Sequence, residues 1–435
     1  MNAIHRFFKI EERGTSVGIE FRAGLATFLT MAYILVVNPQ ILQEAGMPAT
    51  DVALATALCS ALATLIMGLY ANYPFALAPG MGLNAYFTYS VVIGMGVSFQ
   101  TALAAVFIEG VLFLLLTISG ARTTILHAIP MVLKHGTTAG IGLFLAIIGF
   151  QQAGLIAGSE ATLVTLGNVR LPEVVLALLG IVLIAVLLVR RVLGAVLIGI
   201  LVVTAIAWIS GITPLPSSFF SVPSLPRETL FALDFELLLT GKLLTVVIAF
   251  LFVDFFDTAG TLIGVGNLGG FLNKDGELEQ ADEAFTSDAV GTIAGALLGT
   301  STVTTYVESA TGVEEGGRTG LTAVFVALFF LLALFFTPVF SAIPAIATAP
   351  ALIVVGALMM QAVRHIEWSN MGDAIPAFLT IVAMPFTYSI ANGIAAGIIS
   401  LTLIRLFSGR FREVHWSIYL LAALLILFYA TINRS

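Results

Sequence analysis

The sequence predicts an all-α protein that crosses a membrane many times, and three observations lead to this fold class. The chain has 435 residues, of which 59% are hydrophobic and only 10% charged, and its mean hydropathy is +1.06. Soluble domains average about 25% charged residues, so this composition does not suit a surface in water. Fourteen apolar runs, most of them near the length of about 20 residues that spans a bilayer, follow one another. The third and the tenth run are interrupted by residues that disfavour helices.

The apolar runs form two sets of seven, and one further run closes the chain. The first set covers 18–37, 51–70, 74–93, 100–117, 131–150, 172–189 and 192–210. The second covers 240–263, 286–299, 301–316, 318–337, 348–362, 372–388 and 390–407, and the further run is 416–432. Two halves with an odd number of spans have opposite orientations, which predicts an inverted repeat. Short connections at Arg190–Arg191 and near Ala391, before the last span of each half, support the repeat.

The arginines and lysines of the short loops predict the orientation, because cytoplasmic loops carry an excess of both. With the N-terminus in the cytoplasm, the arginines inside are Arg122, Arg190, Arg191, Arg318, Arg364, Arg405, Arg410 and Arg412. Only Arg170, Arg227 and Lys242 then lie outside. We therefore expect a multi-pass protein of the plasma or inner membrane with a cytoplasmic N-terminus. The first residues lack the apolar core of a secretory signal, so the first span is expected to direct insertion.

Composition and spacing also argue against several other classes. The net charge of −7 gives no basic surplus for nucleic acid. The single cysteine, Cys59, excludes a disulfide framework, and the histidines near span ends do not suggest a metal cluster. The acidic loop 273–288 lacks the spacing of an EF-hand, so we expect a solvated connector with acids at the start of a helix there. The stretch Arg227–Leu238 is expected to form an amphipathic helix at the membrane surface.

The two interrupted runs predict a binding site. The first contains Pro79, Gly80 and Gly82, and the second, Ser301–Glu308, is polar and β-branched before it reaches Gly312. Pro and Gly break helices, and Thr and Val favour extended chain. Non-helical backbone at membrane depth is tolerated only where protein or a water-filled cavity satisfies it. Interrupted segments at matching positions of two halves indicate a transporter's site, although two kinked helices packed through small residues are the simpler alternative.

Four acids lie deep in predicted spans, where each costs at least about 2.5–3.5 kcal/mol on insertion scales: Glu109, Asp254, Asp257 and Glu308. The i,i+3 spacing of Asp254 and Asp257 puts both carboxyls on one helix face. Two like charges so close in a partly dry site favour protonation of one, as a proton-coupled carrier needs. A structural hydrogen bond is the alternative for each. Glu308 opens the predicted half-helix, where free N–H groups stabilise a carboxylate that can accept two N–H donors from a flat heterocycle.

Other polar and aromatic residues near the interruptions have both functional and structural interpretations. Asn84 follows the first interruption and offers a donor and an acceptor, or simply caps the half-helix. Glu109 has no broken helix near it, so a structural hydrogen bond is the better interpretation. Phe75 can stack on a planar ring or belong to the core. Since no Lys or Arg shares the depth of the acids, the site suits cations, or neutral molecules rich in N–H groups that move with H⁺ or Na⁺.

These residues belong to motifs that resemble the nucleobase:cation symporter-2 family, and within it the AzgA-like purine permeases. The motifs are Gly18–Gly24 leading into Thr30–Ile34, Ala78–Phe87, Asp254–Thr261 and Glu308–Val313, and the similarity runs from Glu11 to about Arg412. The resemblance implies fourteen segments as two inverted sevens, with short strands and half-helices in segments 3 and 10. It also implies a core domain that slides against a gate domain, through which many members form homodimers.

The resemblance further implies uptake of adenine, guanine and hypoxanthine with protons, with no cofactor. Its substrate-binding residues are Glu308, Asp254, Asn84 and Asp257, and its proton-coupling residues are Asp257, Asp254 and Glu308. Phe75, Thr258, Ser309 and Glu109 complete the candidate set with less support. H⁺ and Na⁺ remain open as the coupling ion, because carboxylates serve either. A uracil or xanthine carrier of the same fold, a cation channel and, more distantly, an intramembrane hydrolase are the alternatives.

The implied domains follow the predicted spans. Residues 1–17 form a cytoplasmic N-terminus, 18–117 and 240–337 the core domain (segments 1–4 and 8–11), and 131–210 and 348–407 the gate domain (segments 5–7 and 12–14). Residues 408–435 form a C-terminal tail with the extra apolar segment, which is additional to the fourteen segments of the family's fold.

Overall fold

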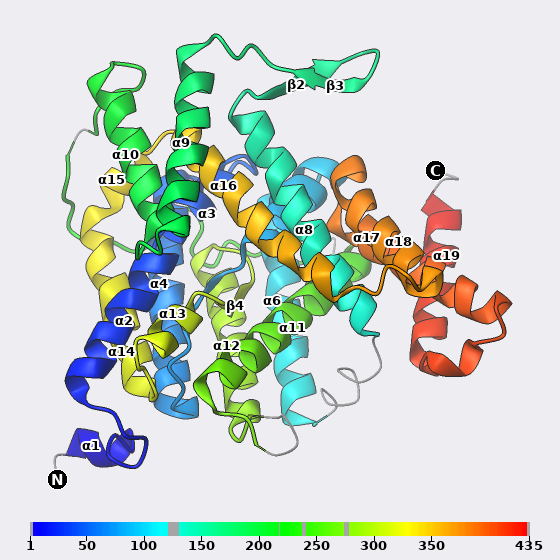
Figure 1. Cartoon of the computed structure of the whole chain (residues 1–435), viewed down its shortest axis with the longest axis horizontal. Helices are drawn as coiled ribbons and strands as arrows, with labels where there is room; N and C mark the ends of the chain where they lie inside the picture. The colour runs from blue at the N-terminus through cyan, green and yellow to red at the C-terminus, as the bar shows by residue number, and fades with distance from the viewer. Residues whose placement is uncertain (1–2, 121–129, 217, 237–240, 274–277, 433–435) are drawn as a thin grey trace. The chain divides into compact units, whose positions relative to one another are not determined.

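A computed structural model describes residues 3–120, 130–216, 218–236, 241–273 and 278–432 (Figure 1). The sequence expectations that rest on Arg122, on His127 (one of the histidines near span ends) and on the acids of 274–277 lie outside the described residues. The described chain is mostly helical, and nine of its helices are long and apolar enough to cross a membrane. This confirms the predicted class of a helical, multi-pass membrane protein.

The first seven segments are built from helices and one short strand. They are α2 (Val17–Met31) with α3 (Ile34–Gln43); α4 (Ala49–Ile66) with η1 (Met67–Ala71); β1 (Leu77–Pro79), α5 (Met81–Ala85) and η2 (Tyr86–Ile93); α6 (Phe99–Ile118); α8 (Met131–Gln152); α9 (Pro172–Val189); and α10 (Ala195–Ile209). A short helix, α1 (Ala3–Phe7), precedes them. Strands β2 (Ile156–Ser159) and β3 (Leu163–Leu166) form a hairpin between α8 and α9.

The second seven segments repeat this order. They are α11 (Gly241–Gly269); α12 (Ala281–Leu298); β4 (Val303–Thr305) with α13 (Ser309–Glu314); α14 (Gly320–Ala333), η3 (Leu334–Phe336) and α15 (Thr337–Ser341); α16 (Ala345–Met359) with η4 (Met360–His365); α17 (Met371–Thr387); and α18 (Ile390–Phe407). After them come η5 (Phe411–Glu413) and α19 (Trp416–Ile432). Strands and half-helices therefore occupy the third and the tenth segment, as predicted.

The chain divides into two compact units, which are described separately. The first comprises residues 1–118 and 152–351, and the second comprises 119–151 and 352–435. The segments expected to form the core domain all lie in the first unit, together with α9 and α10.

Close contacts between helix backbones hold the first unit together. A Cβ atom on Gly320 would lie 1.9 Å from the carbonyl oxygen of Gly68, so α14 and η1 touch through their backbones. The buried carboxylate of Glu20, on α2, accepts hydrogen bonds from the backbone N–H groups of Arg318 and Thr322 and from the Thr322 hydroxyl. Thr322 lies in the first turn of α14 and Arg318 directly precedes the N-cap residue Thr319, where N–H groups lack partners within the helix. Glu20 therefore caps α14 and joins it to α2.

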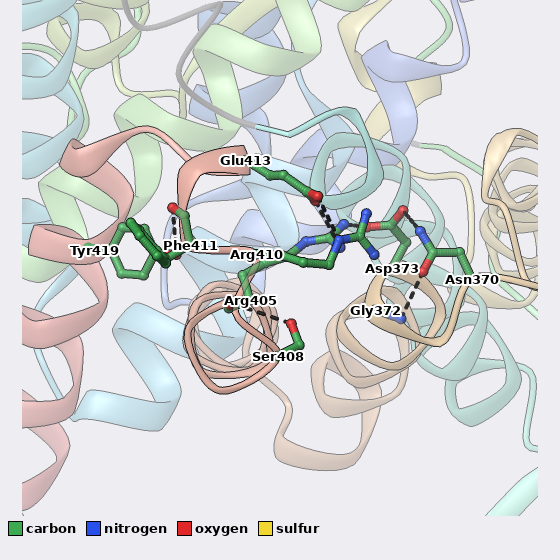
Figure 2. A network of polar contacts seen from close by, with 9 residues as sticks. All are labelled: Asn370, Gly372, Asp373, Arg405, Ser408, Arg410, Phe411, Glu413 and Tyr419. Atoms are coloured by element: carbon green, nitrogen blue, oxygen red, sulfur yellow. Dashed lines mark hydrogen bonds and ion pairs between the residues drawn. The ribbon is translucent and has the colours of Figure 1, made fainter.

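In the second unit a buried arginine ties together the end of α18, the start of α17 and η5 (Figure 2). The Arg405 guanidinium is 2.5 Å from Asp373 and 3.1 Å from Glu413, and Arg405 is only 6% exposed. Arg410 adds a second contact to Glu413 at 2.6 Å. The paired acids offset the cost of burying the cation.

Two expectations for loops are wrong. The described part of Arg227–Leu238, residues 227–236, contains turns and irregular chain instead of an amphipathic helix. Its backbone N–H groups bind outside the segment: Arg227 and Glu228 donate to the Asp51 carboxylate, and Phe231 donates to the Leu297 carbonyl. These contacts replace the hydrogen bonds that a helix would form.

The predicted connector 273–288 is wrong only at its last residue, Asp288, whereas the acids that it places at the start of a helix are confirmed. Helix α12 begins at Ala281, and Asp282 and Glu283 lie in its first turn, where the helix dipole favours acids. Asp288 lies two turns further on and is fully buried.

Candidate substrate-binding site

The two interrupted segments meet as a pair of antiparallel strands. Leu77, Ala78 and Pro79 of β1 lie opposite Thr305, Thr304 and Val303 of β4. Past the strand ends, the N–H of Gly80 donates to the Thr302 carbonyl (3.0 Å) and the N–H of Tyr306 to the Ala76 carbonyl (2.9 Å). Both strands are buried, so this pairing satisfies the backbone groups that the broken helices leave open.

Each strand leads directly into a half-helix. Helix α5 starts after Gly80, and α13 starts after Glu308. The two segments are joined again where the Tyr306 hydroxyl donates to the Pro79 carbonyl (2.5 Å). The Ser309 hydroxyl accepts a hydrogen bond from the N–H of Ala76 (2.9 Å), so this serine links the start of α13 to the chain before β1. The half-helices are thus held in place by contacts between the two repeats.

Glu308 and Asp257 form the accessible acidic pair of this region. Both are half-buried, whereas Val307 beside Glu308 is 61% exposed. Glu308 accepts a hydrogen bond from the hydroxyl of Tyr33 (2.6 Å), which lies in the break between α2 and α3. Asp257 lies on α11, which packs against α13, and its carboxyl is close enough to interact with that of Glu308. The structure therefore brings together two of the four predicted acids.

Asn84 and Thr258 are fully buried next to the strands. The Asn84 amide oxygen accepts a hydrogen bond from the Ser301 hydroxyl, and its amide nitrogen has no partner among the described residues. Thr258 contacts the hydroxyl of Thr304 on β4 (2.8 Å) and donates to Asp288 (2.6 Å). Asn84 retains a donor for a ligand, whereas Thr258 joins α11 to α12 and to β4.

Phe75 lies in an aromatic cluster. It is fully buried and stacks on Tyr73, with ring centroids 5.1 Å apart and planes 16° from parallel. Phe271 meets it edge-on at 5.8 Å. The structure leaves no exposed face of Phe75 for a planar ligand, which agrees with the alternative interpretation of a core residue.

Asp254 and Glu109 lie in a second, fully buried acidic group with Asp288. Asp254 projects from the same helix as Asp257, but it does not share the partial exposure of Asp257 and Glu308. Sequence reasoning missed Asp288 because its position after several loop acids suggested solvent. The predicted span 286–299, which already contains Asp288, was the signal that could have placed it in the membrane.

The accessible group offers hydrogen-bond acceptors and negative charge. The first N–H groups of α13 are not free for a ligand, because those of Ser309, Ala310 and Thr311 donate to the backbone carbonyls of Tyr306, Val307 and Glu308. Arg405 is the single Lys or Arg that is buried among the described residues, and it belongs to the second unit and pairs with Asp373. Within the described ranges, no three acids, histidines or cysteines converge as ligands of a metal ion. The arrangement therefore favours a ligand with N–H donors, with a proton to offset the acids.

Paired strands and half-helices in two repeated sets of membrane segments define a transporter fold of the core-and-gate type. The transmembrane domain of a cyanobacterial bicarbonate transporter, BicA, superimposes with a TM-score of 0.66, covering 86% of this chain and 96% of that chain at 16% identity. The chain belongs to the permease family, whose sequence model matches residues 18–396. The resemblance to the nucleobase:cation symporter-2 family is confirmed.

Two characterised relatives cover nearly the whole chain. The guanine/hypoxanthine permease PbuO of Bacillus subtilis is 45% identical over 415 residues, which are 94% of this chain and 96% of the relative. The adenine permease AdeP of Escherichia coli is 41% identical over 430 residues, which are 98% of this chain and 95% of the relative. Both are named as permeases of purine bases.

Proposed function

We propose that this protein imports purine nucleobases together with protons across the cell membrane, with its N-terminus in the cytoplasm. The observation that carries the proposal is the accessible pair Glu308 and Asp257 beside paired half-helices, in a chain whose relatives are named as adenine and guanine/hypoxanthine permeases. Purine bases are planar and carry several N–H donors, which match carboxylate acceptors. In this proposal the protein is a carrier and not an enzyme.

In this proposal Glu308 accepts N–H groups of the purine, and Tyr33 holds its carboxylate in position. The buried and half-buried acids of this region are costly to ionise together, so binding of a proton accompanies binding of the base. Alternating access follows from movement of a core domain (18–117 and 240–337) against a gate domain (131–210 and 348–407). Homodimerisation through the gate domain is part of the same proposal.

Uptake in cells that lack their own nucleobase permeases tests this function. Radiolabelled hypoxanthine, adenine, guanine and uracil are supplied with and without a protonophore, and membrane insertion is checked by surface labelling. We expect saturable purine uptake that the protonophore abolishes, with little uptake of uracil.

The other outcomes each contradict one part of the proposal. Uptake that survives the protonophore and requires sodium would assign Na⁺ as the coupling ion. Saturable uptake of uracil alone would favour the uracil or xanthine alternative. Conductance without saturable purine uptake, from protein present in the membrane, would favour a cation channel.

A further inference from the structure

Three buried carboxyls form a group apart from Glu308 and Asp257. Glu109 lies on α6, Asp254 on α11 and Asp288 on α12, and each is 0% exposed. Helix α6 packs against both α11 and α12. Helices α6 and α12 lie in close contact beside Glu109. A Cβ atom added to Gly110, the next residue on α6, would lie 2.9 Å from the Thr292 side chain on α12. The charges of Glu109 and Asp288 both act on Asp254.

The three carboxyls differ in the donors that they find. One oxygen of Asp288 accepts hydrogen bonds from the hydroxyls of Thr258 (2.6 Å) and Thr305 (3.1 Å). Glu109 has one distant hydroxyl donor, Thr302, at 3.5 Å, and its other oxygen has none. Neither oxygen of Asp254 receives a hydrogen bond from a hydroxyl, amide or cationic group of the described residues. Asp288 is thus the best placed of the three to carry a negative charge.

The described surroundings of the three carboxyls contain no cation that would allow the others to ionise as well. The charged groups that act on this cluster from α6, α11 and α12 are its own members and Asp257, all of them acids. From the chain around β4, the contacts are the hydroxyls of Thr302 and Thr305. An ionised carboxylate that is buried without a partner is strongly disfavoured. At least one of Glu109 and Asp254 therefore holds a proton when Asp288 is charged.

We propose that Glu109 and Asp254, supported by Asp288, form the site that carries the transported proton, separate from the purine-binding pair Glu308 and Asp257. The inference rests on the proposed proton symport. A chain of hydroxyls joins the two groups, because Thr258 contacts both Asp288 and Thr304, and Thr304 in turn interacts with Asp257. Thr258 also follows Asp257 on α11, and Asp257 acts electrostatically on Asp288. Binding of a base at Glu308 and Asp257 thus changes the charge next to the proton site.

The described carboxyls suit a proton. A bound cation needs several oxygen ligands directed at one point. The described carboxyls do not converge in that way. A proton needs only one or two carboxyl oxygens, and two carboxyls that face each other in a dry site share it readily.

Purified protein in lipid vesicles tests the inference. A pH-sensitive dye follows proton movement driven by hypoxanthine, and exchange of labelled hypoxanthine follows purine movement that needs no net proton transfer. We expect Glu109→Gln to retain exchange within about threefold of the wild type. It should lose purine-driven proton movement by more than about tenfold. Glu109→Asp, which keeps a titratable group, should retain both, and Glu308→Gln should lose both.

The outcomes separate this inference from the proposed function. Wild-type protein that moves purines without protons would overturn the proton symport and the inference with it. Wild-type symport that survives unchanged in Glu109→Gln would overturn the inference alone. Dependence of the wild type on sodium instead of protons would overturn both the proton symport and the inference.

An infrared measurement keeps the test independent of transport and of the stability of variants. The wild-type protein at neutral pH should show the carbonyl stretch of a protonated carboxyl that shifts in D₂O. The absence of such a band would overturn the inference, and its loss in Glu109→Gln or Asp254→Asn would assign it.

Discussion

At the scale of single residues, the acids of this protein differ chiefly in the donors around them. Glu20 accepts several donors at the start of α14, Glu308 accepts the Tyr33 hydroxyl, and Asp254 receives none from the described hydroxyl, amide or cationic groups. The same side-chain chemistry thus serves as a helix cap, as a ligand-accessible acceptor and as a candidate proton carrier. Burial and neighbours decide between these roles.

An acid outside the membrane segments gives a prediction for pH. The hydrogen bond from Arg410 lowers the pKa of Glu413 below its ordinary value of 4.5, and Arg405 adds to this effect (Figure 2). Because the folded state holds the lower pKa, the stabilisation is present above the ordinary value and is lost as the pH falls through the folded one. The melting temperature of the wild type in detergent should therefore fall more between about pH 5 and pH 3 than that of Glu413→Gln. Equal slopes in both proteins would show that this contact contributes nothing.

Sequence reasoning at this scale could identify the acids, but it could not group them. Spacing placed Asp254 and Asp257 on one helix face, whereas the structure buries Asp254 completely and leaves Asp257 half-buried. The partners of Glu109 are distant in the sequence: Asp254 and Asp288 come from two other helices. Tyr33 was missed because nothing in its neighbourhood of apolar residues marks it as a partner of Glu308.

At the scale of elements, the half-helix α13 is positioned by its contact with α2. A Cβ on Gly312 would lie 2.1 Å from the Thr27 hydroxyl oxygen and 2.8 Å from the Ala23 carbonyl oxygen. Both helices would have to move apart, and such overpacking costs about 1–3 kcal/mol. Since Glu308 opens α13, the displacement would also move the carboxylate that we expect to bind the base.

Gly312→Ala is therefore expected to reduce purine uptake by about tenfold, which corresponds to about 1.4 kcal/mol. Gly18→Ala is the matched control, because Gly18 also lies in a helix and a Cβ there would meet nothing within 4 Å. Uptake is measured in cells at equal surface expression. Equal activity of both variants would show that the α2–α13 contact does not position the site.

The sequence was a good guide to the existence of these elements and a poorer one to their ends. Pro79, Gly80 and the β-branched run before Glu308 predicted that segments 3 and 10 are not continuous helices, and β1 and β4 confirm this. The helix expected at Arg227–Leu238 is wrong because its N–H groups bind Asp51 and Leu297 from other segments. Helix propensity and hydrophobic periodicity depend only on neighbouring residues, so they do not reveal hydrogen-bond acceptors in distant segments.

At the scale of the whole molecule, the predicted fold class and family are confirmed, while the orientation and the domain boundaries stay predictions. Within the first unit, a cavity of about 330 Å³ is lined by Gln43, Gln152 and Ser341, among others. The predicted orientation places all three segment ends on the outside of the membrane. The cavity is therefore consistent with alternate segments running in opposite directions.

Cysteine labelling tests the orientation. The native Cys59 is fully buried, so the unmodified protein should not react with a membrane-impermeant maleimide. Thr162→Cys, in the exposed turn between β2 and β3, should be labelled in intact cells, and Ser408→Cys, after α18, only after the cells are opened. The reverse pattern would place the N-terminus outside.

The central claim is that Glu308 binds a purine base, and equilibrium binding to purified protein tests it most directly. Labelled hypoxanthine is titrated against the wild type and Glu308→Gln, with adenine, guanine and uracil as competitors. The loss of a charged hydrogen-bond acceptor, worth about 1.5–3 kcal/mol, should weaken binding by roughly tenfold to a hundredfold. Wild-type binding that purines displace, together with this loss in Glu308→Gln, is the result we expect. Unchanged affinity in correctly folded Glu308→Gln would contradict the claim.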